Sequence, residues 1–350
     1  MKAQVLYGPG DLRYEERPVP EPGEHELLIR VSSVGICGSD VPRILRTGAH
    51  IHPLIPGHEF SGVVVECGRG SDSSLAGKRV GVFPLIPCRS CEACRKKSYE
   101  MCRHYDYLGS RCDGGFAEYV RVPQWQLLPL PEGISDEAAA MLEPLAVAAH
   151  AMRRTEILPE DTVAVTGLGT IGQMLVMLLK DAGVKKIFAV GNKDFQKETV
   201  TGSGIPEEDF IDSREGDAVK RLRELTEGRG CDVCFECVGR NETVKSTLDM
   251  AAIAGRVVLV GNPASDMGLE RDLYWKILRS QLKLCGTWNS SFGGAGDEGD
   301  DWHYVAERIA SGKIVPERLI THRFGLEGLP QGLHIMDGKT EDYIKIMLKP

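Results

Sequence analysis

Residues 163–194 read VAVTGLGTIGQMLVMLLKDAGVKKIFAVGNKD. An apolar, β-branched run at 163–165 meets a glycine-rich turn, and a helix-like apolar segment and a second apolar run at 186–190 follow. This is the strand–helix–strand order of a dinucleotide-binding fingerprint, in which the glycines allow a tight turn, a close approach of pyrophosphate and close helix packing. We expect the phosphates on N–H groups at the helix start. The predicted contact residues are Gly167, Gly169, Thr170, Ile171 and Gly172.

The end of the second apolar run predicts which nicotinamide cofactor is used. An NAD site places a carboxylate about 20 residues past the glycine turn, where it binds the ribose 2′-hydroxyl. Gly191 occupies that place, and Asn192 and Lys193 follow with groups suited to a 2′-phosphate. We therefore expect NADP(H) to be favoured over NAD(H), with use of both cofactors or a preference for NAD(H) as the alternatives. Asp194 lies three residues beyond the expected place and is predicted to be a helix N-cap.

Composition limits the classes of function. The chain has 350 residues and a formal net charge of −8, which argues against a nucleic-acid-binding surface. It contains no run of 18 apolar residues, so no membrane span is expected, and its start, MKAQVLYGPGDLRYEE, lacks the apolar stretch of a signal peptide. We therefore expect a cytoplasmic protein whose eleven cysteines are mostly reduced.

The chain is expected to form two domains in an α/β fold. Residues 1–145 contain short β-type runs at 3–7, 26–33, 62–66, 79–83 and 116–122, which indicate a β-barrel-like domain. Residues 146–290 alternate strands and helices, with further strands at 210–212, 231–238, 256–260 and 282–286, and this predicts a doubly wound parallel sheet. Residues 291–350 are expected to fold back onto the first domain, with a ligand cleft between the two domains.

A first metal site is predicted in the segment PCRSCEACRKKSYEMC, where Cys88, Cys91, Cys94 and Cys102 are spaced C-x2-C-x2-C-x7-C. Four thiolates close a tetrahedral shell around zinc and leave no open position, which is typical of a structural site.

A second group of three cysteines, Cys231, Cys234 and Cys237, lies in an apolar strand. Successive members should point to opposite faces of the sheet, so we interpret them as small buried residues rather than ligands.

A second metal site is indicated by residues from distant segments: Cys37 in GICGSD, His58 and Glu59 in PGHEFSG, and Glu143 in MLEPLA. Each residue alone is equally typical of a structural role. Together they offer one thiolate, one imidazole and one or two carboxylates, the donor set of a catalytic zinc with an open position. Such a metal would bind a substrate hydroxyl and lower its pKa.

These motifs, together with DGGFAEY at 113–119, resemble the zinc-dependent medium-chain alcohol/polyol dehydrogenases over essentially the whole chain. The resemblance implies a GroES-like catalytic domain (1–145 and 291–350), a Rossmann domain (146–290), two zinc ions per chain and a homodimer or homotetramer. It implies Cys37, His58 and Glu143 as catalytic zinc ligands, with Glu59 neighbouring or replacing a ligand. It also implies that Ser39 relays the substrate proton and that Asp40 supports the zinc shell.

Within this family, YDYLGSRCDGGFAEY and KILRSQLKLCGTW resemble the branch that oxidises polyol phosphates such as galactitol 1-phosphate to ketose phosphates such as tagatose 6-phosphate. The alternatives are unphosphorylated polyols (sorbitol, L-iditol or xylitol) and threonine. Arg43, Arg111 and Arg279 are candidate substrate contacts, and each is equally explained as a surface charge. Pro42 replaces a histidine of the alcohol dehydrogenases, so the proton is expected to leave through zinc-bound water, Glu59 or His50.

Two rival classes remain open at this point. A zinc-ribbon module for nucleic acid is disfavoured by the acidic charge. A zinc-free reductase or a non-enzymatic structural relative would be expected to lack Cys37, His58 and Glu143.

Overall fold

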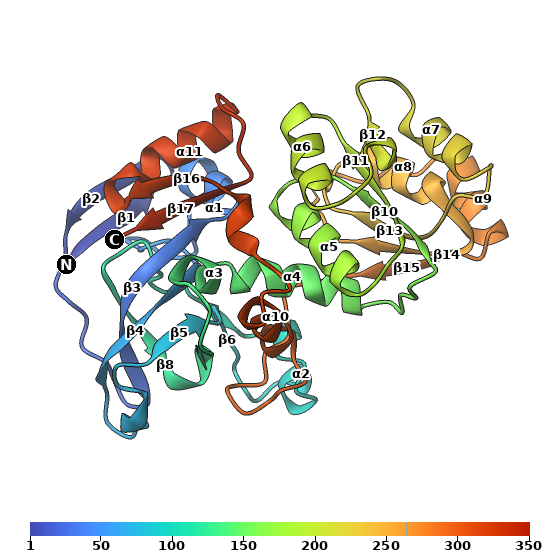
Figure 1. Ribbon diagram of the computed structural model, residues 1–350. Helices are drawn as coiled ribbons and strands as arrows, with labels where there is room; N and C mark the ends of the chain where they lie inside the picture. The colour runs from blue at the N-terminus through green and yellow to red at the C-terminus, as the bar shows by residue number, and fades with distance from the viewer. Residues whose placement is uncertain (264) are drawn as a thin grey trace. The chain divides into compact units, whose positions relative to one another are not determined.

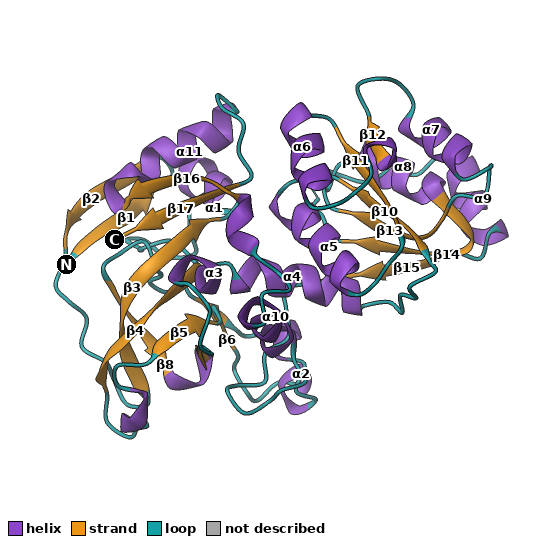
Figure 2. Cartoon of the chain, viewed as in Figure 1, coloured by secondary structure: helices purple, strands orange, loops and turns teal. Residues whose placement is uncertain are grey.

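The computed structural model describes residues 1–263 and 265–350, whose contacts form two compact units. The first unit comprises Met1–Ala146 and Ser290–Pro350, and the second comprises Val147–Asn289. The first unit is rich in strands, whereas the second alternates strands with helices (Figure 1, Figure 2).

The second unit is built around a six-stranded sheet in the order β12-β11-β10-β13-β14-β15, and every neighbouring pair is parallel. Its strands are β10 (Thr162–Thr166), β11 (Lys186–Gly191), β12 (Phe210–Asp212), β13 (Cys231–Glu236), β14 (Ala251–Leu259) and β15 (Lys283–Gly286). Its helices are α5 (Thr170–Asp181), α6 (Asp194–Gly202), α7 (Ala218–Leu225), α8 (Asn241–Met250) and α9 (Arg271–Arg279). The chain forms the central strand β10 first, then β11 and β12 towards one edge, and then β13, β14 and β15 towards the other edge. This strand order confirms the predicted doubly wound fold.

Helices cover both faces of this sheet. Helices α5 and α6 lie on one face, and α7, α8 and α9 lie on the other (Figure 1). On the second face, Phe188 and Cys234 of the strands pack with Leu222 of α7 and Leu248 of α8 in one buried cluster. This arrangement explains why the strands are nearly continuous apolar runs, because a parallel sheet is buried on both faces.

The prediction for the cysteines of β13 is partly wrong. Cys231 and Cys234 are fully buried, as expected, but both belong to the same hydrophobic cluster instead of pointing to opposite faces. The pairing of β13 with β14 shifts register between Cys231 and Val233. Such a bulge breaks the two-residue alternation of a regular strand. Cys237 lies just past the end of the strand and is half-buried.

The first unit contains a seven-stranded sheet in the order β16-β17-β3-β4-β5-β9, with β8 paired to β3. Its strands are β3 (Glu26–Ile36), β4 (Glu59–Cys67), β5 (Arg79–Val82), β8 (Tyr119–Pro123), β9 (Leu127–Pro129), β16 (Ile320–Gly325) and β17 (Lys345–Lys349). Two further antiparallel pairs are β1 (Lys2–Gly8) with β2 (Asp11–Glu16), and β6 (Leu85–Ile86) with β7 (Asp106–Tyr107). The helices are α1 (Asp40–Pro42), α2 (Glu92–Arg95), α3 (Asp136–Ala140), α4 (Leu142–Arg153, which continues into the second unit), α10 (Asp301–Ala310) and α11 (Leu329–Gly338).

Strand β3 organises the first unit because it pairs with β4, β8 and β17. Its alternate residues, such as Leu27, Ile29 and Val31, enter one hydrophobic core together with Leu329 and Leu333 of α11. Residues 320–349 thereby join the same sheet as residues 26–36, although the whole second unit separates them in sequence. Strands β3 and β4 are longer than the sequence predicts, and β4 begins at Glu59, a predicted site residue.

Among the helices of the described residues, none has both the length and the apolar character needed to cross a membrane.

Candidate active site

Three metal-donor side chains meet at one end of the β3–β4 pair. One donor atom each of Cys37, His58 and Glu59 lies within 4.8 Å of the other two. Cys37 follows directly after β3, His58 directly precedes β4, and the antiparallel pairing sets Gly35 opposite Glu59. The register of two strands therefore assembles the donors. A thiolate, an imidazole and a carboxylate are ligands that suit a catalytic zinc.

Asp40 lies behind this group and orients it. Its carboxylate is completely buried and accepts hydrogen bonds from Arg43 Nη1 at 2.5 Å and from the Cys37 backbone N–H at 3.0 Å. The carboxylate also lies 3.4 Å from Nδ1 of the buried His58, a nitrogen that has no hydrogen bond of good geometry within the described residues. Burial acts to raise the pKa of Asp40, but His58 and Arg43 outweigh it and lower the pKa. An ionised Asp40 behind Nδ1 orients the ring and leaves Nε2 available to a metal.

The other predicted residues of this segment lie beside the donors. Ser39 Oγ is 3.3 Å from Cys37 Sγ, and Arg43 Nη2 is 3.5 Å from Ser39 Oγ. Arg43 is mostly buried and forms the ion pair with Asp40. The hydroxyl expected to relay a proton and the cation expected to bind a phosphate are thus both adjacent to the metal donors.

The remaining candidates have different surroundings. Arg111 stacks over the ring of Tyr105, 4.6 Å from its centroid, and Arg279 is exposed at the end of α9 in the second unit. His50, one proposed exit for the proton, is exposed, and its backbone N–H binds the Ser110 carbonyl.

Glu143 reaches the site through Tyr107. The Tyr107 hydroxyl donates a hydrogen bond of 3.2 Å to the Glu143 carboxylate, and the Tyr107 ring contacts the His58 ring edge-on at 5.7 Å between centroids. Burial raises the pKa of Glu143 to about 7. Among the described residues, the donor group that gathers within 4.8 Å contains Glu59 and not Glu143. A ligand role for Glu143 stays a prediction.

Lys345 is a site residue that the sequence analysis missed. Its ammonium group contacts the Glu59 carboxylate and donates a second hydrogen bond of 3.1 Å to the Ile36 carbonyl. Both charged side chains are only 2% exposed. The available signal was a lysine inside the apolar run IKIML (344–348), a position where an unpaired charge would be costly.

The four cysteines of residues 88–102 converge as the spacing predicts. The Sγ atoms are 3.5 Å apart for Cys91–Cys94 and 3.9 Å apart for both Cys88–Cys94 and Cys91–Cys102, and none forms a disulfide. Zinc–sulfur bonds of about 2.3 Å in a tetrahedron require sulfur–sulfur distances of about 3.8 Å. Hydrogen bonding from Ser90 also lowers the pKa of Cys88 to about 5, which favours a thiolate. The cluster therefore has the dimensions of a closed zinc site.

The glycine turn has the shape that a bound pyrophosphate needs. Gly167 has a φ of +93°, and a Cβ on Gly172 would lie 1.9 Å from the Gly167 carbonyl oxygen, so both positions exclude side chains. A Cβ on Gly169 would meet nothing within 4 Å. Gly169 is the N-cap of α5, without a capping side chain. The backbone at this helix start is therefore open on the side where phosphate oxygens could approach.

The segment after β11 differs from the prediction in one respect. Asp194 is the first residue of α6 and Lys193 holds the N-cap position, so the N-cap assignment of Asp194 is wrong by one residue. The Asp194 carboxylate instead contacts Arg214. The Asn192 N–H donates to Gln196 Oε1 at 3.0 Å, and a Cβ on Gly191 would lie 2.8 Å from the same oxygen.

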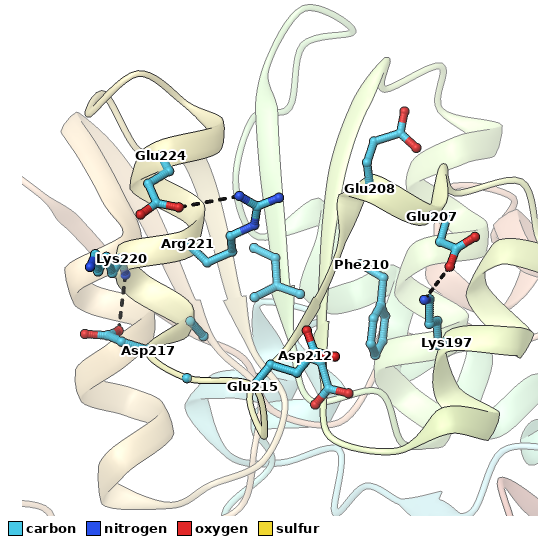
Figure 3. Close-up of a pocket in the computed structure, with 13 residues that line it drawn as sticks. Lys197, Glu207, Glu208, Phe210, Asp212, Glu215, Asp217, Lys220, Arg221 and Glu224 are labelled. Carbon is cyan, nitrogen blue, oxygen red and sulfur yellow. Dashed lines mark hydrogen bonds and ion pairs between the residues drawn. The ribbon is translucent and has the colours of Figure 1, made fainter.

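A cavity of about 740 Å³ lies in the second unit, between α6, β12 and α7 (Figure 3). Charged side chains line it, and several form ion pairs with each other, such as Lys197 with Glu207 and Arg221 with Glu224. None of the residues predicted to bind metal, cofactor or substrate is part of its lining. We therefore assign it no role in the chemistry.

Comparison with known proteins identifies the class. Residues 23–132 match the alcohol dehydrogenase GroES-like domain, and residues 170–311 match the zinc-binding dehydrogenase family. The chain is 33% identical over 335 residues to galactitol 1-phosphate 5-dehydrogenase of Escherichia coli K12, with 95% of each chain covered. It is 32% identical over 358 residues to sorbitol dehydrogenase of Halalkalibacterium halodurans, covering 100% of this chain and 99% of the relative. The protein thus belongs to the zinc-dependent medium-chain alcohol/polyol dehydrogenases, oxidoreductases that act on CH–OH groups.

Solved structures agree with this assignment. The crystal structure of galactitol-1-phosphate dehydrogenase from Escherichia coli superimposes with a TM-score of 0.92 at 32% identity, covering all of both chains. Two further structures each superimpose with a TM-score of 0.90, and each match covers 100% of this chain and 99% of the other chain. One is a zinc-binding dehydrogenase from Sinorhizobium meliloti 1021 bound to NADP, which is 29% identical. The other is an alcohol dehydrogenase from Escherichia coli CFT073 complexed with NADH, which is 27% identical. Relatives of this fold therefore bind either nicotinamide cofactor.

The two candidate metal sites should respond differently to loss of one thiolate. Cys37→Ser should abolish turnover and leave the fold intact, because an open site acts on the substrate. Cys91→Ser should lower thermal stability or prevent assembly, because a closed thiolate site contributes to folding. Zinc content, thermal unfolding and dehydrogenase rate would be measured for each variant. A Cys37→Ser protein with a near-normal rate would contradict the catalytic assignment.

Loss of the lysine that neutralises Glu59 should be costly. Lys345→Met leaves a buried carboxylate unpaired and should lower the free energy of unfolding by about 3–5 kcal/mol. Lys349→Met is the matched control, because Lys349 lies on the same strand, is 59% exposed and pairs with Glu137 at the surface. The control should change stability by about 0.5 kcal/mol or less. Equal effects of the two variants in denaturant unfolding would refute the role of the buried pair.

Proposed function

We propose that this enzyme oxidises a secondary alcohol of a polyol phosphate reversibly to a ketose phosphate, with NADP(H) favoured over NAD(H) and two zinc ions per chain. The observation that carries the proposal is the gathering of Cys37, His58 and Glu59 at the end of the β3–β4 pair. Similarity to galactitol 1-phosphate 5-dehydrogenase supports a phosphorylated substrate, and similarity to sorbitol dehydrogenase supports a free polyol as the second candidate.

The roles of individual residues follow from their positions. When bound, a zinc ion at this site would act as a Lewis acid and lower the pKa of the substrate hydroxyl. Cys37 and His58 would hold this metal, with a carboxylate from Glu59 or Glu143. Ser39, adjacent to Cys37, is placed to relay the substrate proton, taking it up as its own hydroxyl proton passes to the next acceptor. Asp40 fixes the orientation of the His58 ring.

Arg43 is the proposed phosphate contact. Its ion pair with Asp40 uses Nη1, whereas a guanidinium carries five N–H donors in a fixed fork. A second nitrogen, Nη2, lies 3.5 Å from Ser39 Oγ. A cation already held by a buried carboxylate is oriented before the substrate arrives, which suits bidentate recognition of a phosphate.

A rate panel tests the proposal. Initial rates would be measured for galactitol 1-phosphate, galactitol, sorbitol and threonine, each with NADP⁺ and NAD⁺. We expect kcat/KM to be highest for the phosphorylated polyol with NADP⁺. In Arg43→Ala, KM for the phosphorylated substrate should rise at least about tenfold more than KM for a free polyol, because a charge-assisted contact is lost only there. A wild type that prefers free polyols, or an equal effect of Arg43→Ala on both KM values, would contradict the phosphate assignment.

We also propose that the chain forms homo-oligomers through the β15 edge of the six-stranded sheet. Strand β15 has a neighbour on one side only, so its other edge offers unpaired backbone groups. Large apolar side chains are exposed around it on α9, on β15 itself and beyond it: Tyr274, Trp275, Leu278, Leu284 and Trp288. A second copy related by a twofold axis presents the same edge and the same apolar groups, so it complements both features.

A charge on this surface should weaken association. Leu278→Glu should shift the protein towards monomer in light scattering coupled to size-exclusion chromatography, because an apolar interface would have to bury a carboxylate. Val65→Glu is the control, because Val65 is an exposed apolar residue of the first unit, 44% exposed against 51% for Leu278. A wild type that is monomeric at all concentrations would refute the proposal.

A further inference from the structure

Arg214 lies next to the place that selects the cofactor, although it belongs to a different strand. Strand β12 pairs in parallel with β11, and the pairing sets Asp212 opposite Gly191. Just beyond β12, the backbone N–H and the hydroxyl of Ser213 donate hydrogen bonds of 2.9 and 3.1 Å to the Gly191 carbonyl. Arg214 follows directly, so its backbone is fixed beside the residue expected to face the cofactor ribose.

Two carboxylates hold the Arg214 side chain. Nε lies 2.9 Å from Asp212 Oδ1, and Nη2 lies 2.5 Å from Asp212 Oδ2. Nη2 also contacts the carboxylate of Asp194, the first residue of α6. Within the part of the chain that the structure describes, Nη1 makes no hydrogen bond, so donors remain for a further acceptor.

The two ion pairs differ in how easily they can be exchanged. The Asp212 side chain is only 10% exposed and accepts hydrogen bonds from two nitrogens of Arg214, whereas the Asp194 side chain is 83% exposed. An ion pair in water contributes little, because solvent screens it. A dianionic phosphate could therefore replace Asp194 while Asp212 keeps the guanidinium in position.

A phosphate at this corner would depend on Arg214 for charge compensation. Asp194 and Asp212 carry two negative charges next to Gly191, and Arg214 neutralises them only in part. Without Arg214, the charged groups among these residues would be Asp194 and Asp212, and both would repel the phosphate. Nucleotide sites that accept a 2′-phosphate commonly place an arginine near the end of the second strand, and Arg214 reaches this place from the neighbouring strand.

We propose that Arg214 is the residue that recognises the 2′-phosphate of NADP(H), with Asp194 as the carboxylate that the phosphate displaces. The proposal rests on the NADP(H) preference proposed above. It assigns a direction to each residue: Arg214 strengthens binding of the phosphorylated cofactor, and Asp194 weakens it by competition. A purely structural role, joining α6 to β12, would affect both cofactors alike.

Direct binding tests this assignment independently of turnover. Dissociation constants of NADPH and NADH would be measured for the full chain by nicotinamide fluorescence, with adenosine 2′,5′-bisphosphate and 5′-AMP as fragments that differ only in the 2′-phosphate. Arg214→Ala should weaken the binding of NADPH and of the bisphosphate at least about tenfold, because one charge-assisted contact is lost. It should change the dissociation constants of NADH and AMP by no more than about twofold. Asp194→Asn should tighten NADPH binding and leave NADH unchanged.

Arg221→Ala is the matched control. Arg221 is 54% exposed against 47% for Arg214, pairs with a carboxylate on α7 and lies on the wall of the cavity in Figure 3. The Arg221→Ala variant should leave the ratio of the NADPH and NADH dissociation constants at the wild-type value. Thermal unfolding would show that each variant is folded. An Arg214→Ala protein that keeps the wild-type ratio overturns the assignment, whichever cofactor the wild type prefers. A wild type that binds NADH at least as tightly as NADPH, with Arg214→Ala still acting on NADPH alone, overturns only the proposed preference.

Discussion

The end of the first unit that carries the candidate metal donors depends on compensation of buried charge. Glu59 and Asp40 are carboxylates with almost no access to solvent, and each has one cation, Lys345 or Arg43, within contact. Removing a charge from water costs several kcal/mol, and only a well-placed partner offsets that cost. The end of β3, the start of β4 and strand β17 are therefore fixed relative to each other. The donor atoms of Cys37 and His58 are therefore held in fixed positions as well, as a catalytic site requires.

The two arginines near the expected ligands show how burial changes the use of the same chemistry. Arg43 pairs with a carboxylate that water cannot reach, so this ion pair holds its guanidinium group in place. Arg214 pairs with one shielded carboxylate and one carboxylate in water. The shielded partner sets its position and the solvated partner can leave. A site can thus be oriented in advance and still exchange one contact for a ligand.

Local chemistry made much of this protein predictable from its sequence. A closed zinc site needs four thiolates in one short segment, and a nucleotide turn needs glycines at fixed spacing, so Cys88–Cys102 and Gly167–Gly172 could be recognised without a fold. The errors have a common origin in tertiary pairing. The bulge after Cys231 depends on how β13 meets β14, and the true partner of Asp194 lies 20 residues further along the chain. Lys345 could not be assigned to the site because its partner, Glu59, is 286 residues away.

The same separation has a consequence for how the protein is made. The sheet of the first unit is interrupted in sequence by the whole second unit, and β17 lies between β16 and β3 inside that sheet. Ribosomes add about 5–20 residues per second, so Glu59 waits on the order of half a minute for Lys345 to be synthesised. The second unit, whose strands are contiguous in sequence, can complete its sheet during that interval. A nascent chain can therefore hold a folded Rossmann sheet well before Glu59 acquires its buried counter-charge.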